Sequence, residues 1–357
     1  MANKFSDKEE SSNFPGAIAF GSEKIAIAGR NFRGLSAHPN GEDLLLGECS
    51  LQSPDVCRVL KYNLRTGALQ HYDLPKDYGY WHASFSPSGK YIVMMRVPDP
   101  VGNANNLETL QRSEIVTMKS DGTDFRVVSL KPGYKDTPTM SDDDQLIAYW
   151  RGTVRPPGSK SLVSRKDIWQ INLQTGNDEL FTGPFQFFEG GPLQYLPGNQ
   201  EILTRAWGPA VHAQSMGEYS RRINNSSVYQ FKRGQTDLPL PLLAEVEFAD
   251  YASINSKGGI YFYGVRPTYS LFRKSKQGEL TQWAFPRGVA GQDGITEVIT
   301  LPSARYMLLI YGIPTETFSR SAPKQRRIGM LDMQTSTWLN LIVPAMAGST
   351  PIAVIAR

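Results

Sequence analysis

The stretch Phe85-Ser86-Pro87-Ser88-Gly89-Lys90-Tyr91-Ile92-Val93 places a tight turn directly before a strongly apolar strand. Proline presets the φ of a turn and glycine supplies a positive φ, so this composition predicts a turn between two strands. The strand after it continues to Met95 without alternating polar residues, which is typical of a strand that is buried on both faces. A strand, a turn and a doubly buried strand therefore form the first half of a structural unit.

This half-unit comes round six times. The other turns are Pro39-Asn40-Gly41-Glu42, Ser141-Asp142-Asp143-Asp144, Leu196-Pro197-Gly198-Asn199, Asn255-Ser256-Lys257-Gly258-Gly259 and Leu301-Pro302-Ser303-Ala304. The turn centres lie about 46 to 59 residues apart. Each turn precedes an apolar run, and these runs are Leu44–Leu46, Tyr91–Met95, Leu146–Trp150, Ile202–Leu203, Ile260–Tyr263 and Tyr306–Tyr311. A repeat of this length indicates a modular architecture.

Each unit continues with two further short strands. Third strands are expected at Val59–Leu64, Ile115–Met118, Ile168–Leu173, Leu271–Lys274 and Ile328–Met333. Fourth strands are expected at Leu69–Leu74, Arg126–Leu130, Glu179–Thr182, Leu238–Leu243, Leu280–Phe285 and Trp338–Val343. Helical periodicity is nearly absent, and four antiparallel strands repeated at this period read as blades that stack around a circle. We therefore predict an all-β fold, a single β-propeller of six or seven four-stranded antiparallel blades.

The two ends of the chain decide the number of blades. The runs at Ala17–Phe20, Lys24–Ala28 and Pro351–Ile355 are strand-like. They supply either a seventh blade shared between the termini, which we slightly prefer, or an extra strand on the sixth blade. We expect residues 1–15 to form a flexible N-terminal tail and residues 16–357 to form the propeller domain.

The turn at Ser86–Lys90, followed by Ile115–Met118 and the turn Ser120-Asp121-Gly122-Thr123, resembles the TolB-like group of WD-type propeller repeats. In that group an S-P-D-G-K turn precedes the second strand and a D-G-(T/S) turn follows the third. The match is good in the second unit, partial in the third and degenerate elsewhere. The group includes periplasmic partner-binding proteins and relatives of hydrolases and lyases, so the resemblance implies the fold and leaves the function open.

Composition narrows the class of protein. The net charge is +4, the pI is near 8.9, and 40% of the residues are hydrophobic. No apolar run approaches the ~18 residues of a membrane helix, so a membrane-spanning protein, a coiled coil and a wholly disordered chain are excluded. The first ten residues have no apolar core and do not read as a signal peptide.

Cys49 and Cys57 are the only cysteines, and strand-like runs flank them. Facing each other across a hairpin, they would lie at disulfide distance; two unrelated buried thiols are the alternative. An oxidised pair favours an extracytoplasmic or periplasmic location, and reduced thiols a cytoplasmic one.

Catalytic motifs are scarce. The sequence has no G-x-S-x-G elbow, no Walker or Rossmann glycine pattern, and four histidines without zinc-ligand spacing. We predict no cofactor and no metal. Connections between blades border the central channel, and they bring Trp81, His82, Asp136, Glu189, Asp250, Asp293 and Glu297 to its mouth. These acids either bind a cation such as Ca²⁺ or are solvated turn residues.

The excess of positive charge lies in the long links between second and third strands. The links Arg151–Lys166, Trp207–Asn225 and Ile313–Arg327 have net charges of +5, +1 and +3, so the rest of the chain is about −5. In a propeller all such links share one face, and a focused positive surface attracts an anionic partner. The candidate binding residues are Arg151, Arg155, Lys160, Arg165, Lys166, Trp207, Tyr219, Arg221, Arg222, Phe318, Arg320, Lys324, Arg326 and Arg327.

These patterns favour a non-catalytic scaffold within a larger assembly, which binds an acidic protein segment or an anionic polymer. Nucleic acid fits less well, because the basic residues lack a regular aromatic platform. The alternative is a polysaccharide lyase or glycosidase with its site at the channel mouth. There Asp136 and Glu189 would exchange protons, and Arg151 or Arg205 would neutralise a uronate.

Overall fold

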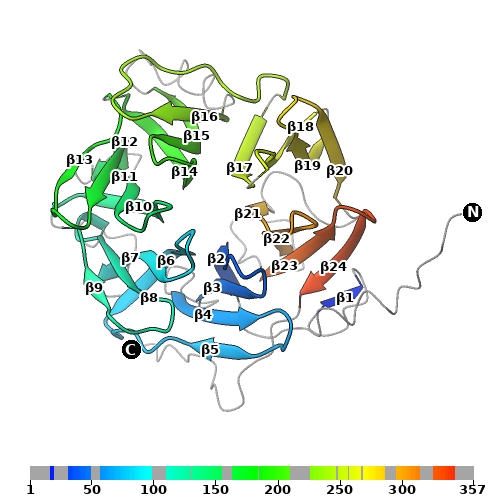
Figure 1. Cartoon of the computed structure of the whole chain (residues 1–357), viewed down its shortest axis with the longest axis horizontal. Helices are drawn as coiled ribbons and strands as arrows, with labels where there is room; N and C mark the ends of the chain where they lie inside the picture. Colours follow the sequence, from blue (N-terminus) through cyan, green and yellow to red (C-terminus); the bar gives the residue numbers. More distant parts are fainter. Residues whose placement is uncertain are drawn as a thin grey trace, which may run out of the picture.

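The computed structural model describes residues 17–19, 31–49, 57–98, 110–129, 131–154, 163–183, 185–209, 226–246, 248–255, 257–266, 268–285, 295–313 and 325–341. Within these ranges the strands form six blades arranged in a ring, with the first strand of each blade nearest the centre (Figure 1). The predicted all-β propeller is confirmed. Of the two blade numbers left open, six is the correct one.

The first three blades follow the predicted order of four strands each. Blade one holds β2 (Asn31–Ala37), β3 (Asp43–Cys49), β4 (Cys57–Asn63) and β5 (Leu69–His71). Blade two holds β6 (Tyr78–Phe85), β7 (Tyr91–Pro98), β8 (Glu114–Lys119) and β9 (Arg126–Val127). Blade three holds β10 (Tyr134–Met140), β11 (Leu146–Val154), β12 (Val163–Asn172) and β13 (Asp178–Leu180).

The other three blades complete the ring. Blade four holds β14 (Phe187–Tyr195), β15 (Glu201–Pro209) and β16 (Ser226–Lys232). Blade five holds β17 (Phe248–Ile254), β18 (Ile260–Val265), β19 (Tyr269–Lys274) and β20 (Leu280–Ala284). Blade six holds β21 (Ile295–Thr300), β22 (Tyr306–Ile313), β23 (Gln325–Asp332) and β24 (Thr337–Leu341).

Strand β1 (Ala17–Ala19) shows how the N-terminal segment is used. It pairs antiparallel with β24 and adds a fifth strand to the outer edge of blade six. The preference for a seventh blade is therefore not met, and the alternative of an added strand on the sixth blade holds for this segment. The predicted strands at 24–28 and 351–355 and the predicted tail at 1–15 lie outside the described residues.

The predicted fourth strand at Leu238–Leu243 is wrong. This segment has an irregular conformation, although the Leu242 N–H donates to the Val228 carbonyl of β16 at 2.8 Å. Pro239 and Pro241 have no N–H and cannot continue a ladder, so the apolar pattern alone was misleading here. Leu240 remains 85% exposed as a result.

Apolar clusters between neighbouring blades hold the ring together. Each of the six clusters joins residues of two adjacent blades, and one of them closes the ring between blades six and one. Successive residues of a strand point to opposite faces. In β3, Leu44 and Leu46 pack toward blade six while Leu45 packs toward blade two, and all three are fully buried. This explains why the second strand of each unit reads as an unbroken apolar run.

The turn between β6 and β7 of blade two also contacts blade three. The Gly89 N–H donates to the Ser86 carbonyl at 2.9 Å, and Gly89 has a φ of +75°. The Ser88 hydroxyl donates to Asp144 in the corresponding turn of blade three, at 2.7 Å. The motif therefore stabilises its own turn and also links that turn to the corresponding turn of blade three.

Of the two alternatives left open for Cys49 and Cys57, the disulfide is the one that the structure contains. The two residues lie directly opposite each other at the ends of β3 and β4, and both are buried. Replacing both by alanine is expected to lower the free energy of unfolding by about 2.5 kcal/mol, because closing so short a loop restricts the unfolded chain.

Urea unfolding with and without a thiol reductant tests this expectation. The reductant should destabilise the wild type and leave the double variant unchanged. Equal stability of the two proteins under oxidising conditions would show that the bridge contributes nothing.

Candidate functional site

Six inner strands surround the central channel: β2, β6, β10, β14, β17 and β21. The register between each of them and its second strand shifts at a β-bulge, which lies inside the strand in five cases and at its start in β21. A bulge bends a strand and redirects its side chains. The repeated bulge divides the channel into a half with ionic groups and a half lined mainly by apolar residues.

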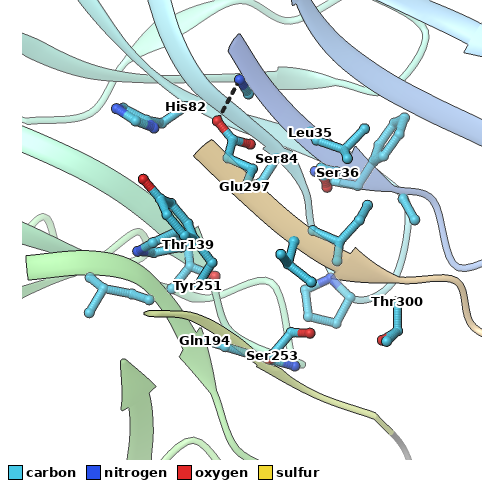
Figure 2. A pocket seen from close by; sticks show the side chains of 18 of the residues that line it. Leu35, Ser36, His82, Ser84, Thr139, Gln194, Tyr251, Ser253, Glu297 and Thr300 are labelled. Atoms are coloured by element: carbon cyan, nitrogen blue, oxygen red, sulfur yellow. Dashed lines mark hydrogen bonds between the residues drawn. The ribbon is translucent and has the colours of Figure 1, made fainter. Parts of the chain in front are cut away.

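Unusual backbone conformations occur at these bulges. His82, Thr137 and Tyr251 hold equivalent positions and have φ values of 51°, 41° and 49°, and Gly34 at the matching place has 78°. Non-glycine residues in this region cost about 1 kcal/mol or more and persist only where the surroundings enforce them. The bulges are therefore built features that direct His82 and Tyr251 toward the channel (Figure 2).

Asp136 is the centre of the first ionic group. Its carboxylate lies 2.9 Å from Lys166 Nζ, 3.2 Å from His82 Nε2 and 3.0 Å from the Tyr134 hydroxyl. Burial raises the pKa of Asp136, but Lys166, His82 and the hydrogen bonds outweigh it, so the net pKa lies below the ordinary value. The buried carboxylate therefore stays ionised and ties blade two to blade three.

Arg205 forms the second ionic group, between blades four and five. Its Nε donates to Asp250 at 2.7 Å, and Nη1 lies 3.9 Å from Glu189. The guanidinium also lies 5.1 Å from the centroid of the Trp207 ring. Burial lowers the pKa of Arg205, but the charges of Asp250 and Glu189 raise it by more than burial lowers it, so the net shift of this pKa is upward. The guanidinium is thus already neutralised by carboxylates of the protein.

The predicted channel residues that the structure describes lie on inner strands, although Trp81 packs against the apolar cluster between blades two and three. Trp81 and His82 lie on β6, Asp136 on β10, Glu189 on β14 and Asp250 on β17. Asp293 lies outside the described residues. Asp136 is paired with Lys166, and Glu189 and Asp250 lie beside Arg205, while Glu297 accepts the Gly34 N–H at 2.7 Å. Among the described residues no group of three or more His, Cys, Asp or Glu is placed to hold a metal ion.

The structure describes only some of the predicted basic and aromatic binding residues. The prediction that Lys166 binds a partner is wrong, because this side chain is buried and paired with Asp136. Arg165 is exposed, Arg151 is half-buried against the Trp169 ring at 4.4 Å, and Trp207 and Arg327 are half-buried. Arg326 lies in β23. Outside the described residues lie Arg155, Lys160, Tyr219, Arg221, Arg222, Phe318, Arg320 and Lys324.

A cavity of about 440 Å³ occupies the other half of the channel, and all six inner strands line it (Figure 2). Sequence reasoning missed most of its lining, including Tyr251, Pro138 and Pro192. The two prolines were a usable signal, because proline inside a strand marks an edge or a bulge. Both lie at the bulge of an inner strand.

Comparison with solved structures supports the architecture. TolB from Acinetobacter baumannii is similar, with a TM-score of 0.58 and 12% identity over 84% of this chain and 63% of that chain. The oligogalacturonate lyase from Vibrio parahaemolyticus has a TM-score of 0.53 and 11% identity over 91% of this chain and 83% of that chain. An oligogalacturonate lyase in complex with manganese has a TM-score of 0.51 and 11% identity, covering 87% and 76%.

These likenesses show the fold alone. This chain spans less than two thirds of the length of the TolB chain. No protein-family model matches the sequence, and no curated protein matches it. The fold is a TolB-like propeller, and the function has to be argued from the residues of this chain. Within the described ranges, no helix has the length and apolar character needed to cross a membrane.

Proposed function

We propose that this protein is a non-catalytic interaction scaffold, a component of a larger assembly that binds an acidic protein segment or an anionic polymer. The binding surface would be the link face, defined by the segments 98–112, 151–166, 207–225 and 313–327. The observation that carries the proposal is the joint placement of these segments. Each one follows the second strand of a blade and precedes the third, and the antiparallel order makes the second strands of these blades end at the same face of the ring.

Charge distribution supports the proposal. Three of the four segments together carry +9, while the whole chain carries +4. Lys166 is neutralised by Asp136, and its loss leaves the sign of this surplus unchanged. A positive surface on an otherwise acidic protein accelerates and orients the capture of an anionic partner.

Charge reversal on the link face tests the proposal, with poly-L-glutamate as the probe. The variant Arg155→Glu/Lys160→Glu/Arg320→Glu/Lys324→Glu should weaken binding at low salt by about tenfold or more, because several screened contacts are lost together. A matched variant reverses four exposed lysines on the opposite face, Lys90, Lys119, Lys257 and Lys276. Both variants shift the net charge from +4 to −4.

Titration of fluorescent polymer at several salt concentrations measures the effect. The control variant should retain most of the wild-type affinity. Equal losses of affinity in the two variants would mean that net charge alone attracts the polymer. Unchanged affinity in both variants would show that the link face does not bind it.

The enzyme alternative receives no support from specific contacts. Asp136, its expected acid or base, is buried and paired with Lys166. Arg205, its expected uronate ligand, is bound to Asp250. Both groups would have to leave existing ion pairs before they could act on a substrate.

An extracytoplasmic location is part of the proposal. Its support is the Cys49–Cys57 disulfide, since structural disulfides persist mainly in oxidising compartments. A non-reducing mass measurement on protein from its native source tests this part, and a reduced pair would contradict it.

A further inference from the structure

Strand β20 forms the outer rim of blade five (Figure 1), and its outer edge has no strand partner among the described residues. An unpaired edge attracts other extended chains, so proteins protect such edges with short strands, charged residues, prolines or a covering segment. The other blades that have a fourth strand show such protection. β5, β9 and β13 have only two or three residues, and β24 is covered by β1.

β20 itself lacks these protections. It has five residues, none of them charged and none a proline, and three of the five are exposed. In an antiparallel hairpin, residues whose main chain bonds the neighbouring strand alternate with residues whose main chain points away from it. The Ser275 N–H donates to the Glu279 carbonyl at 2.8 Å. Counting on from this pair, the main-chain groups that point outward belong to Leu280, Gln282 and Ala284.

A cavity of about 280 Å³ lies next to β20, between blades five and six. Arg273 and Trp283 line it from blade five, and Arg305 and Met333 line it from blade six. Arg273 is paired with Thr281, which lies two residues before Trp283, so these three side chains point to the same side of the hairpin. In a strand added to β20, the two side chains beside Thr281 and Trp283 would therefore also project on the side of this cavity.

Arg273 gives this side of the hairpin its charge preference. Its side chain is exposed, and it forms no ion pair or hydrogen bond with the described residues. The other arginine of the cavity, Arg305, donates from Nε to Asp332 at 3.0 Å and is neutralised within the protein. The half-buried Trp283 ring offers apolar contact area nearby. An added strand is therefore favoured when it carries an acidic side chain beside Arg273 and an apolar one beside Trp283.

We propose that the outer edge of β20 binds an extended segment of a partner protein as an added antiparallel strand. From its amino end, the segment has an apolar residue beside Trp283, one intervening residue, and an acidic residue beside Arg273. Main-chain hydrogen bonds to β20 supply affinity, and the two side chains supply specificity. Blade six already carries a fifth, antiparallel strand, β1. None of these residues belongs to the link face, so the proposal does not rest on the scaffold function.

Ligand-observed NMR titrations on the full chain test the proposal with N-acetylated peptide amides. The lead peptide, Thr-Val-Thr-Leu-Thr-Glu-Thr, should bind with a dissociation constant on the order of 0.5 mM. Its reversed sequence has the same composition and should bind at least about fivefold more weakly, as should the form with glutamine in place of glutamate. Methylating the amide nitrogen between leucine and the next threonine removes a main-chain donor and should weaken binding by about tenfold or more.

Two variants of Gln282 test the edge itself. Gln282→Pro removes an outward N–H and leaves the pairing of β19 with β20 intact, because this N–H takes no part in it. It should weaken binding of the lead peptide by about tenfold or more. Gln282→Thr loses the same side-chain bond to Ser270 but keeps the N–H. It should therefore bind the lead peptide at least about fivefold more tightly than Gln282→Pro does.

A second pair of variants tests the charge preference. Arg273→Gln should weaken binding of the lead peptide by about fivefold and leave the glutamine form unaffected. Arg58→Gln removes an exposed arginine from β4 of blade one and should change neither. Thermal unfolding checks that each variant is folded.

Several results would overturn the proposal. These are no binding of the lead peptide at about 5 mM, equal binding of its reversed or N-methylated form, or unchanged binding in Gln282→Pro. A wild-type dimer in analytical ultracentrifugation that Gln282→Pro dissociates would show that a second copy of this chain occupies the edge instead. If Gln282→Pro does not fold, the peptide comparison on the wild type still decides. The link-face charge-reversal variant should bind the glutamine form as the wild type does, so failure of this proposal and failure of the scaffold proposal are distinguishable.

Discussion

Replacing Gly190 with alanine is expected to lower the free energy of unfolding by about 3 kcal/mol or more, one of the largest effects of a single methyl group in this fold. A Cβ at this position would lie 2.0 Å from Cε2 of the Trp150 ring. The ring cannot retreat easily. Trp150 is fully buried, its Nε1 donates to the Gly191 carbonyl at 2.8 Å, and it packs edge-on against Phe187 at 5.8 Å. The added methyl group must therefore displace either a strand or the indole.

Urea unfolding of two further variants isolates this cause. Gly176→Ala changes a turn residue whose Cβ would meet no atom within 4 Å, so it should cost only about 1 kcal/mol through its positive φ. Trp150→Phe is itself destabilising, but adding Gly190→Ala to it should cost much less than in the wild type. Similar losses for Gly190→Ala and Gly176→Ala would show that the indole moves aside freely.

Local chemistry explains why the fold was predictable. The side chains of Leu44–Leu46 point alternately to two neighbouring blades. Three consecutive apolar residues therefore indicate a strand that is buried on both faces. The turn at Ser86–Gly89 is held by hydrogen bonds within the turn itself. Signals of this kind depend on neighbours in sequence, and they repeat with each blade. The Cys49–Cys57 pairing was predictable for the same reason, because a hairpin places the two residues opposite each other.

Long-range pairing explains what the sequence did not reveal. Lys166 reads as part of a basic link, yet β12 begins at Val163 and carries Lys166 into the interior, next to Asp136. Thirty residues separate the two partners, and nothing local distinguishes Lys166 from Arg165, which is exposed. The bulges of the inner strands have the same character. Their positions depend on the ring closing around the channel, so His82 could be placed near the mouth but not oriented, and Tyr251 was missed.

Replacing Arg205 with methionine is expected to lower the free energy of unfolding by about 3–5 kcal/mol, because it leaves Asp250 buried without its partner. The Arg205 and Asp250 side chains are each 7% exposed, and their contact at 2.7 Å joins blade four to blade five. Methionine occupies a similar volume, so the loss reports the uncompensated carboxylate more than a cavity. Glu189, 3.9 Å from the guanidinium, would also lose its nearest described cation.

The exposed pair Arg65–Glu42 provides the matched control for this prediction. Its side chains are 75% and 44% exposed, and Arg65→Met should cost less than about 1 kcal/mol. In the double variant Arg205→Met/Asp250→Asn the buried charge is gone, so most of the loss should be recovered. Urea unfolding of five proteins measures these differences: the wild type, Arg205→Met, Asp250→Asn, their double variant and Arg65→Met. If Arg205→Met is no more harmful than Arg65→Met, or if the double variant is as unstable as the sum of its parts, the pair does not hold blades four and five together.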